Sequence, residues 1–182
     1  MTKLNKGDAF PSFSFNTAYQ KNLNSINILK GKTVFWVLRY IGCTVCRYDV
    51  QLIAERYQEF IDKNAQVYVL MQSDAEHVQN DLAKTDTHLP FKIITDPEMK
   101  IYDLLSIEPA ESMEKLAEGV GEALREKAKL ARKAGFSHGD YEGNEQQLPA
   151  LFIVNEDGTA AYAHYAKNIM DMPSIDEVLE ML

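Results

Sequence analysis

Short apolar runs alternate with amphipathic stretches along the chain, and their lengths predict strands followed by helices. The runs at 33–40, 67–71 and 91–95 are rich in β-branched and aromatic residues. Because they are nearly continuous, they are typical of strands buried on both faces of a parallel sheet. Apolar positions at helical spacing predict helices over 43–63, from a cap at 73 or 74 to about 84, and over 99–105. This order predicts an α/β domain.

The two ends of the chain predict further elements. Residues 8–15 carry three phenylalanines and alternate in their second half, which predicts a short strand. Pro11 would place this strand at a sheet edge or at a strand start. The apolar runs within 151–165, joined by an Asp-Gly turn, predict a β-hairpin. Ser174 is a suitable N-cap for a last helix over 175–182.

Residues 108–147 interrupt the alternation. Their first part, 111–134, predicts a helix whose acidic residues come early and whose basic residues come late, as the helix dipole favours. Gly119 and Gly121 are expected to kink or split this helix, and the polar segment 136–147 to form a loop. The apolar stripe is thin and rich in alanine. Two interpretations therefore stay open: an insertion packed on the core, or a surface for a homodimer or another partner.

The properties of the whole chain argue against several classes of function. A chain of 182 residues is expected to form a single domain, 1–182, with its own core. The formal net charge of −8 argues against a nucleic-acid surface and against binding to an acidic membrane face. The chain starts without an apolar leader and has no stretch of roughly 18 apolar residues, so neither a signal peptide nor a membrane span is expected. We therefore expect a cytoplasmic protein.

The two cysteines of the chain, Cys43 and Cys46, stand where the strand over 33–40 turns at Gly42 into the next helix. Unpaired N–H groups and the dipole at a helix N-terminus stabilise a thiolate, the nucleophilic form of cysteine. Two intervening residues let the sulfurs close a small disulfide ring that opens and closes without unfolding the domain. In a reducing compartment such a pair is more often catalytic or metal-binding than structural.

Polar residues beside the cysteines are candidates for a supporting role. Arg39 and Arg47 flank the pair and are expected to favour the thiolate. Tyr40 and Thr44 are candidate hydrogen-bond donors at the site, although Tyr40 is equally suited to packing. Asp49 is expected to lie on the solvated surface.

Three other interpretations of the cysteine pair stay open on the residues alone. A zinc site would need about four ligands, and the four histidines are scattered, so no metal and no other cofactor is expected. Two inert buried thiols are compatible with the way free cysteine packs, but the turn and the helix start count against them. A cysteine hydrolase would need a paired base, which the sequence does not place.

The order of short motifs along the chain resembles the thioredoxin superfamily. Within it, the chain resembles the peroxiredoxin-like proteins of the alkyl hydroperoxide reductase and thiol-specific antioxidant family. Residues 7–13 resemble that family's lead-in to its first strand, and 148–158 its late strand and hairpin. The segment 134–143 is similar to one in peroxiredoxin-like redoxins that carry Cys-x-x-Cys. The resemblance implies a thioredoxin-like α/β fold: a central mixed β-sheet flanked by helices, with a helical insertion before the last hairpin.

Departures from the family's peroxidase pattern, Pro-x-x-x-Thr-x-x-Cys with a distant Arg, separate two activities. Laid on this chain, the pattern puts Cys46 in the peroxidatic place, Cys43 in that of Thr, Arg39 in that of Pro and Pro149 at or near that of Arg. Three of the four residues are therefore missing. In thioredoxins the first cysteine is the nucleophile and a cis-proline faces it. Cys43 and Pro149 match those places, while Gly42 stands where thioredoxins have Trp.

The resemblance thus implies a thiol–disulfide oxidoreductase. Cys43 would attack a protein or small-molecule disulfide, Cys46 would resolve the mixed disulfide, and a thiol reductant would restore the pair. The first alternative is a peroxidase with Cys46 as the peroxidatic and Cys43 as the resolving thiol. The second alternative is a redox-inactive or sensing protein that binds a partner through the insertion 108–147.

Overall fold

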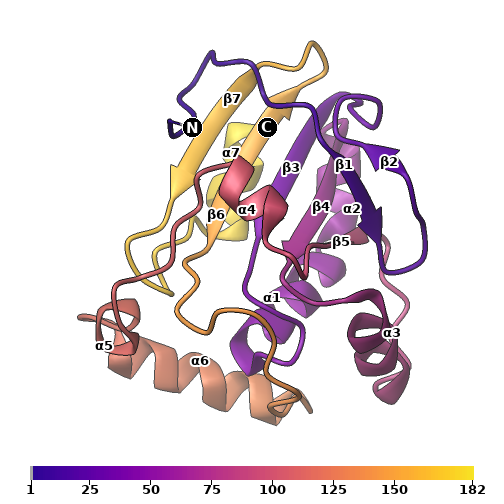
Figure 1. Cartoon of the computed structure of the whole chain (residues 1–182). Coiled ribbons are helices and arrows are strands. Elements are labelled where there is room, and N and C mark those ends of the chain that lie inside the picture. The colour runs from indigo at the N-terminus through magenta and orange to yellow at the C-terminus, as the bar shows by residue number, and fades with distance from the viewer. Residues whose placement is uncertain (1) are drawn as a thin grey trace.

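A seven-stranded sheet lies at the centre of the computed structural model, which describes residues 2–182 (Figure 1). Met1, part of the expected domain, lies outside the described residues. The strand order is β2-β1-β5-β4-β3-β6-β7, and parallel and antiparallel pairs occur together, so the sheet is mixed. The strands are β1 (Ser14–Thr17), β2 (Leu23–Asn24), β3 (Lys32–Val37), β4 (Ala65–Met71), β5 (Lys92–Thr95), β6 (Ala150–Asn155) and β7 (Ala160–Tyr165).

Helices cover both faces of this sheet. They are α1 (Thr44–Glu55), α2 (Tyr57–Asp62), α3 (Ala75–Lys84), α4 (Lys100–Leu104), α5 (Met113–Leu116), α6 (Gly121–Lys133) and α7 (Ile175–Met181). Apolar residues of α1, α2, α3 and α7 share one core cluster with Val34 and Trp36. Those of α4 share the other with Phe35 and the phenylalanines that precede β1 or lie in it. In Figure 1, α4 accordingly lies in front of the sheet and α1, α2 and α7 behind it.

β3 is buried on both faces because it lies inside the sheet, parallel to β4 and antiparallel to β6. Val34 faces Val67 of β4 in register, and Phe35 faces Phe152 of β6. The continuous apolar run therefore predicted this strand's central place correctly. The chain leaves β3 after Val37 and reaches Cys43 just before α1.

Two of the predicted helices are each split in two. The helix predicted over 43–63 ends as α1, because Arg56 leaves helical geometry with a ψ of 9°, and α2 follows it. The helix predicted over 111–134 becomes α5 and α6. Gly119 lies between them with a φ of +73°, a backbone conformation that favours glycine, and this confirms the split expected there.

The N-terminal strand is displaced from its predicted place at 8–15. The backbone N–H of Phe10 donates to the carbonyl of Gly158 at 2.8 Å, so this segment first follows the β6–β7 turn and joins the sheet only at β1. β2, not β1, forms that edge of the sheet. The C-terminal hairpin is confirmed, and Ser174 caps α7 in a capping box with Glu177.

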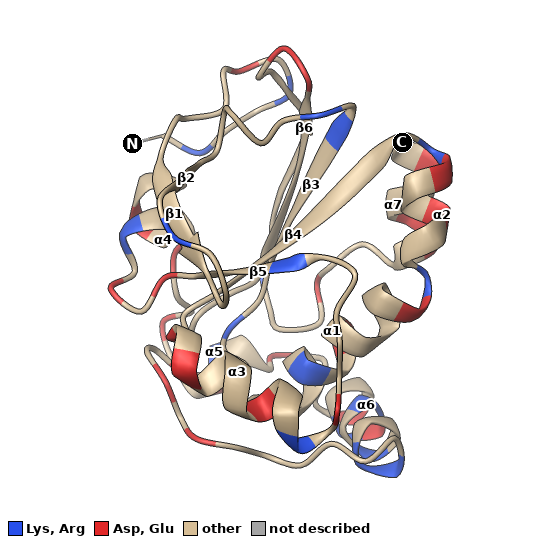
Figure 2. Cartoon of the chain, turned by 90° about the vertical axis from the view of Figure 1, so that its right-hand side faces the viewer, with Lys and Arg blue, Asp and Glu red and all other residues tan. Residues whose placement is uncertain are grey.

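Charged residues gather on the helices and loops. Figure 2 shows them on the outward sides of α2, α3, α6 and α7, whereas β3 and β4 are largely free of them except at one end of β3. Within residues 2–182, no helix combines the length and the apolar composition needed to cross a membrane. The fold thus matches the expected α/β architecture, with the insertion carrying α5 and α6.

Candidate active site

The cysteine pair lies at the start of α1, as the pattern predicted. Cys43 is the N-cap residue, and its Sγ accepts a hydrogen bond from the backbone N–H of Cys46 at 3.4 Å. Both cysteines are free, and their exposed fractions are 1% and 3%. Thr44, between them, opens the helix and is half-buried. The first turn of α1 therefore presents its unpaired amide groups to Cys43.

Arg39, which lies between β3 and the cysteine turn, donates a hydrogen bond to the Cys43 sulfur. Its Nη2 donates to Cys43 Sγ at 3.1 Å, and its Nη1 donates to the backbone carbonyl of Glu145 at 2.7 Å. Arg39 Nε is buried without a partner in the structure. One guanidinium thus joins the Cys43 sulfur to the insertion that lies over it.

The pKa values of the two thiols are shifted in opposite directions. Burial alone would raise the pKa of Cys43, but the hydrogen bond from Cys46 and the charge of Arg39 outweigh burial and lower this pKa to about 6. Burial and the neighbouring Cys43 sulfur raise the pKa of Cys46 well above its ordinary value. At neutral pH the arrangement therefore holds Cys43 as a thiolate and Cys46 as a thiol.

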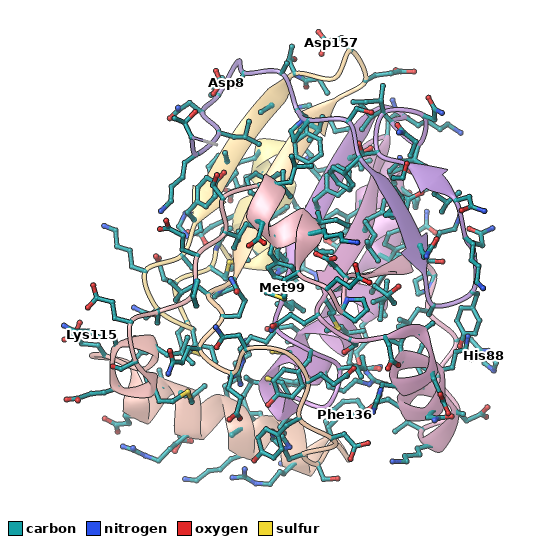
Figure 3. All side chains as sticks on the ribbon, in the orientation of Figure 1. Asp8, His88, Met99, Lys115, Phe136 and Asp157 are labelled. Atoms are coloured by element: carbon teal, nitrogen blue, oxygen red, sulfur yellow. The ribbon has the colours of Figure 1, made fainter. Side chains whose placement is uncertain are left out.

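Arg47 does not stabilise the thiolate, so the expectation for this residue was wrong. Its exposed fraction is only 2%, and its Nε lies 2.7 Å from Asp81 Oδ1 on α3. Nη2 donates to the hydroxyl groups of Thr85 and Thr87 at 3.1 and 2.9 Å. The guanidinium also stacks 4.4 Å above the ring of Phe136, the residue labelled near α1 in Figure 3. Arg47 thus joins α1 to α3 and to the end of the insertion.

Gly42 is needed because the insertion approaches it closely. Its carbonyl accepts a hydrogen bond from the N–H of Gly139 at 2.8 Å, and a Cβ at Gly42 would overlap the backbone carbonyl of Asp140. A tryptophan of the thioredoxin type could not occupy this position. Segment 137–147, here called the cover segment, therefore lies directly against the cysteine turn.

Tyr40 contacts the cover segment rather than the sulfurs. Its hydroxyl lies 3.2 Å from His138 Nε2, and burial raises its pKa. The imidazole of His138 packs against Tyr141, with ring centroids 4.3 Å apart. Tyr40 is fully buried, so it serves both packing and hydrogen bonding, the two uses weighed for it.

Pro149 lies beside the site, but not with the backbone expected of it. No cis peptide bond occurs among residues 2–182, so the predicted cis bond before Pro149 was wrong. The physical reason is that an X–Pro bond stays trans unless the local structure requires the cis isomer, and β6 begins at the residue after Pro149. Extended backbone runs directly into the sheet there. Pro149 instead lines a cavity of about 190 Å³ together with Arg39 and Cys46.

The same cavity contains an ion pair that sequence reasoning missed. Asp49 and Lys127 line it, with Lys127 Nζ 2.6 Å from Asp49 Oδ1. Burial raises the pKa of Asp49, and Lys127 offsets this in part. The expectation that Asp49 is solvated surface was therefore wrong. Its position three residues after Cys46 on one helix was a usable signal, but its partner comes from the insertion, 78 residues further along the chain.

Comparison with known proteins agrees with this fold. The sequence profile of the AhpC/TSA antioxidant enzymes matches residues 51–168, so the match begins after Cys46. No curated protein sequence matches the chain.

Three solved structures illustrate the similarity of fold. A yeast mitochondrial 1-Cys peroxiredoxin has a TM-score of 0.67 at 16% identity, covering 97% of this chain and 73% of that one. A peroxiredoxin-like protein from Aquifex aeolicus has a TM-score of 0.67 at 14% identity, covering 100% and 90%. A thiol peroxidase from Chromobacterium violaceum has a TM-score of 0.63 at 10% identity, covering 99% and 87%. With the profile match over nearly two-thirds of its length, the chain belongs to the AhpC/TSA antioxidant enzyme family, in its peroxiredoxin-like, thioredoxin-fold form.

Proposed function

We propose that this protein is a thiol–disulfide oxidoreductase in which Cys43 is the nucleophile and Cys46 the resolving thiol. Membership in an antioxidant enzyme family implies redox chemistry of the peroxidase or thiol oxidoreductase type. The observation that carries the finer assignment is the contact of Cys43 Sγ with Arg39 Nη2 at 3.1 Å and with Cys46 N–H. Arg39 also lies near Cys46, but burial and the Cys43 sulfur outweigh its charge and raise the pKa of Cys46, so this thiol keeps its proton. This difference supports an ordered reaction.

In the first step, the Cys43 thiolate attacks one sulfur of a disulfide, and the other substrate sulfur leaves as a thiolate. Cys46 then loses its proton and attacks Cys43 in the mixed disulfide, which releases the second substrate thiolate. The substrate gains two electrons, and the protein is left with a Cys43–Cys46 disulfide. A thiol reductant returns the two electrons, as a cytoplasmic location would allow.

The proton of Cys46 needs an acceptor in a buried place. Asp49 lines the same cavity as Cys46 and stands one helical turn away from it. We assign Asp49 the acceptance of this proton, with Lys127 holding the carboxylate in place at 2.6 Å. Pro149 lines the same cavity as Cys46 and Asp49.

Access to the first sulfur requires movement of the cover segment. Cys43 is only 1% exposed, and the cover segment contacts both Gly42 and Arg39. The cover segment contains no helix or regular strand, so it can be displaced without breaking the sheet. A disulfide substrate would therefore reach Cys43 after the cover segment moves aside.

Peroxide reduction is the second candidate, and the family supports it. The cavity beside Cys46 holds about 190 Å³, enough for a small hydroperoxide. A peroxidase reaction would convert one thiolate to a sulfenic acid with release of an alcohol or water. The other thiol would then displace water and form the disulfide. The raised pKa of Cys46 opposes its use as the peroxidatic thiol.

Trapping experiments separate these candidates. In Cys46→Ser, a disulfide substrate should accumulate as a mixed disulfide on Cys43, detected by mass spectrometry of the intact protein and its peptides. Cys43→Ser is the matched control and should trap little. Adducts that form on Cys46 in Cys43→Ser and not on Cys43 would reverse the assignment. Rapid sulfenic acid formation with peroxide, without trapping of any disulfide, would favour the peroxidase.

A further inference from the structure

We propose that Asp74, His77 and Glu142 form a binding site for a divalent cation of the zinc type, which fastens the cover segment to α3. Asp74 is the N-cap of α3 and His77 lies in its first turn, whereas Glu142 comes from the cover segment. One ligand atom from each of the three lies within 4.8 Å of the other two. The site is separate from the cysteine pair and uses none of its side chains.

The distances within the cluster suit a tetrahedral ion. His77 Nδ1 lies 2.9 Å from Asp74 Oδ1 and 3.3 Å from Glu142 Oε2. Zinc takes imidazole nitrogen and carboxylate oxygen at about 2.0–2.2 Å, so its tetrahedral ligands lie roughly 3.3 Å apart. The two contacts therefore fall near the separations of ligand atoms around one zinc ion. Three protein ligands leave a fourth position for water.

The buried side chain of Glu142 provides an independent observation that favours a cation. Its side chain is only 9% exposed, and Oε2 accepts the backbone N–H of Asp74 at 3.0 Å. Oε1, in contrast, is buried without any hydrogen-bond partner in the structure. A buried carboxylate oxygen with no donor is costly, and a cation coordinated by both carboxylate oxygens of Glu142 would satisfy it.

The charge of the cluster also favours a cation. Three carboxylates surround one imidazole, because Asp140 Oδ2 lies 3.4 Å from His77 Nε2 on the other side of the ring. Among residues 2–182, no Lys or Arg forms an ion pair with Asp74, Asp140 or Glu142. Even with a protonated His77, the group would carry two uncompensated negative charges. A divalent ion would neutralise them.

The proposed cation site lies close enough to the cysteine turn to affect access to the cysteine pair. Gly139 and Asp140, which lie against Gly42, precede Glu142 by only two or three residues. A cation held between α3 and Glu142 would therefore keep the cover segment closed over the cysteine turn. This consequence rests on the proposed function, but the binding of the ion does not.

The test uses the full-length chain with both cysteines replaced, Cys43→Ser/Cys46→Ser, so that no thiol can bind metal and no redox activity is involved. Titration with Zn²⁺ in a calorimeter should give one ion per chain, and Co²⁺ should give the visible absorption of a tetrahedral complex. Hydrogen exchange of residues 137–147 should slow when Zn²⁺ is added.

Single substitutions in this background test the ligands. Glu142→Gln keeps an oxygen for the Asp74 N–H but should weaken Zn²⁺ binding more than about 100-fold, since loss of even an outer-shell partner costs about 10–100-fold. His77→Ala should do the same. Glu76→Gln removes a neighbouring carboxylate of α3 outside the cluster and is the matched control, with unchanged affinity.

Two results would overturn the proposal. One is the lack of a saturable isotherm up to about 100 μM Zn²⁺ in a variant whose circular dichroism shows it folded. The other is Zn²⁺ binding that Glu142→Gln and His77→Ala leave unchanged. Because the protein tested has no thiols, either result leaves the oxidoreductase proposal untouched, and failure of disulfide trapping leaves this one untouched.

Discussion

Arg39 and Arg47 stand four residues before and four residues after Cys43, yet they serve different parts of the molecule. Arg39 lies on the irregular segment between β3 and α1, and its guanidinium contacts the Cys43 sulfur. Arg47 lies in the first turns of α1, where the helix directs its side chain to Asp81 and two threonines. Sequence distance from a nucleophile is therefore a poor guide to electrostatic contact, because the local backbone decides the direction of each side chain.

The largest effect, a loss of stability, is expected for Arg47→Met. The substitution leaves Asp81 without its partner and removes the contacts with Thr85 and Thr87. Removing one partner of a buried ion pair lowers the free energy of unfolding by about 3 kcal/mol. Urea denaturation measures this loss. The pH midpoint of Cys43 alkylation should not move. Arg56→Met, which removes two ion pairs at the surface, with Glu59 and Asp176, should cost far less. A shifted Cys43 midpoint in Arg47→Met would contradict the division of roles.

Arg39→Gln should change the reactivity of Cys43 rather than the stability of the fold. Without the guanidinium, burial dominates and the pKa of Cys43 rises from about 6. Once the pKa exceeds the pH of the measurement, each further unit of rise lowers the thiolate fraction about tenfold, so we expect alkylation at pH 6.5 to slow by between about threefold and tenfold or more. Site-resolved mass spectrometry after timed iodoacetamide treatment measures this rate. An unchanged rate would mean that the helix N-terminus alone stabilises the thiolate.

The pH profile of the unmodified protein sharpens the comparison. The thiolate is the reactive form, and the Cys43 pKa of about 6 lies below its ordinary value. Alkylation of Cys43 should therefore be half-maximal near pH 6, fall below that pH and level off above about pH 7.5. Cys46 should stay unreactive throughout this range, because its pKa is raised. A Cys43 midpoint near 8.5, the ordinary thiol value, would remove the basis of the assignment.

The smallest effect is expected for Asp49→Asn. This variant keeps the shape of the side chain but removes the proposed acceptor of the Cys46 proton. The second step, release of substrate from the mixed disulfide, should slow by several-fold, while alkylation of Cys43 stays as in the parent. Stopped-flow measurement of the two phases separates these steps. Slowing of the first phase instead would place Asp49 at Cys43.

The cysteine turn could be predicted from the sequence because every signal for it is local. A buried strand, a glycine and a helix start follow one another within 33–46, and each is a property of neighbouring residues. The split at Gly119 was visible for the same reason. The mixed sheet followed from the family resemblance together with the run of strands.

The supporting contacts could not be predicted, because they join distant parts of the chain. Lys127 reaches Asp49 from α6, and Glu145 meets Arg39 across the insertion. No periodicity or spacing encodes such pairs. The cis bond expected before Pro149 was wrong for another reason: it was carried over from a family pattern, and no feature of this sequence indicated it by itself.

Arg39 donates one hydrogen bond to the Cys43 sulfur and one to the cover segment, and it thereby couples the redox state of Cys43 to the position of that segment. While Cys43 is a thiolate, its negative charge holds the guanidinium that also binds the Glu145 carbonyl. Forming the Cys43–Cys46 bond removes that charge, so Arg39 loses its anionic partner and only a neutral carbonyl remains. The cover segment should therefore be bound more weakly in the oxidised protein than in the reduced one. A reductant would thus meet a more open site than a substrate does.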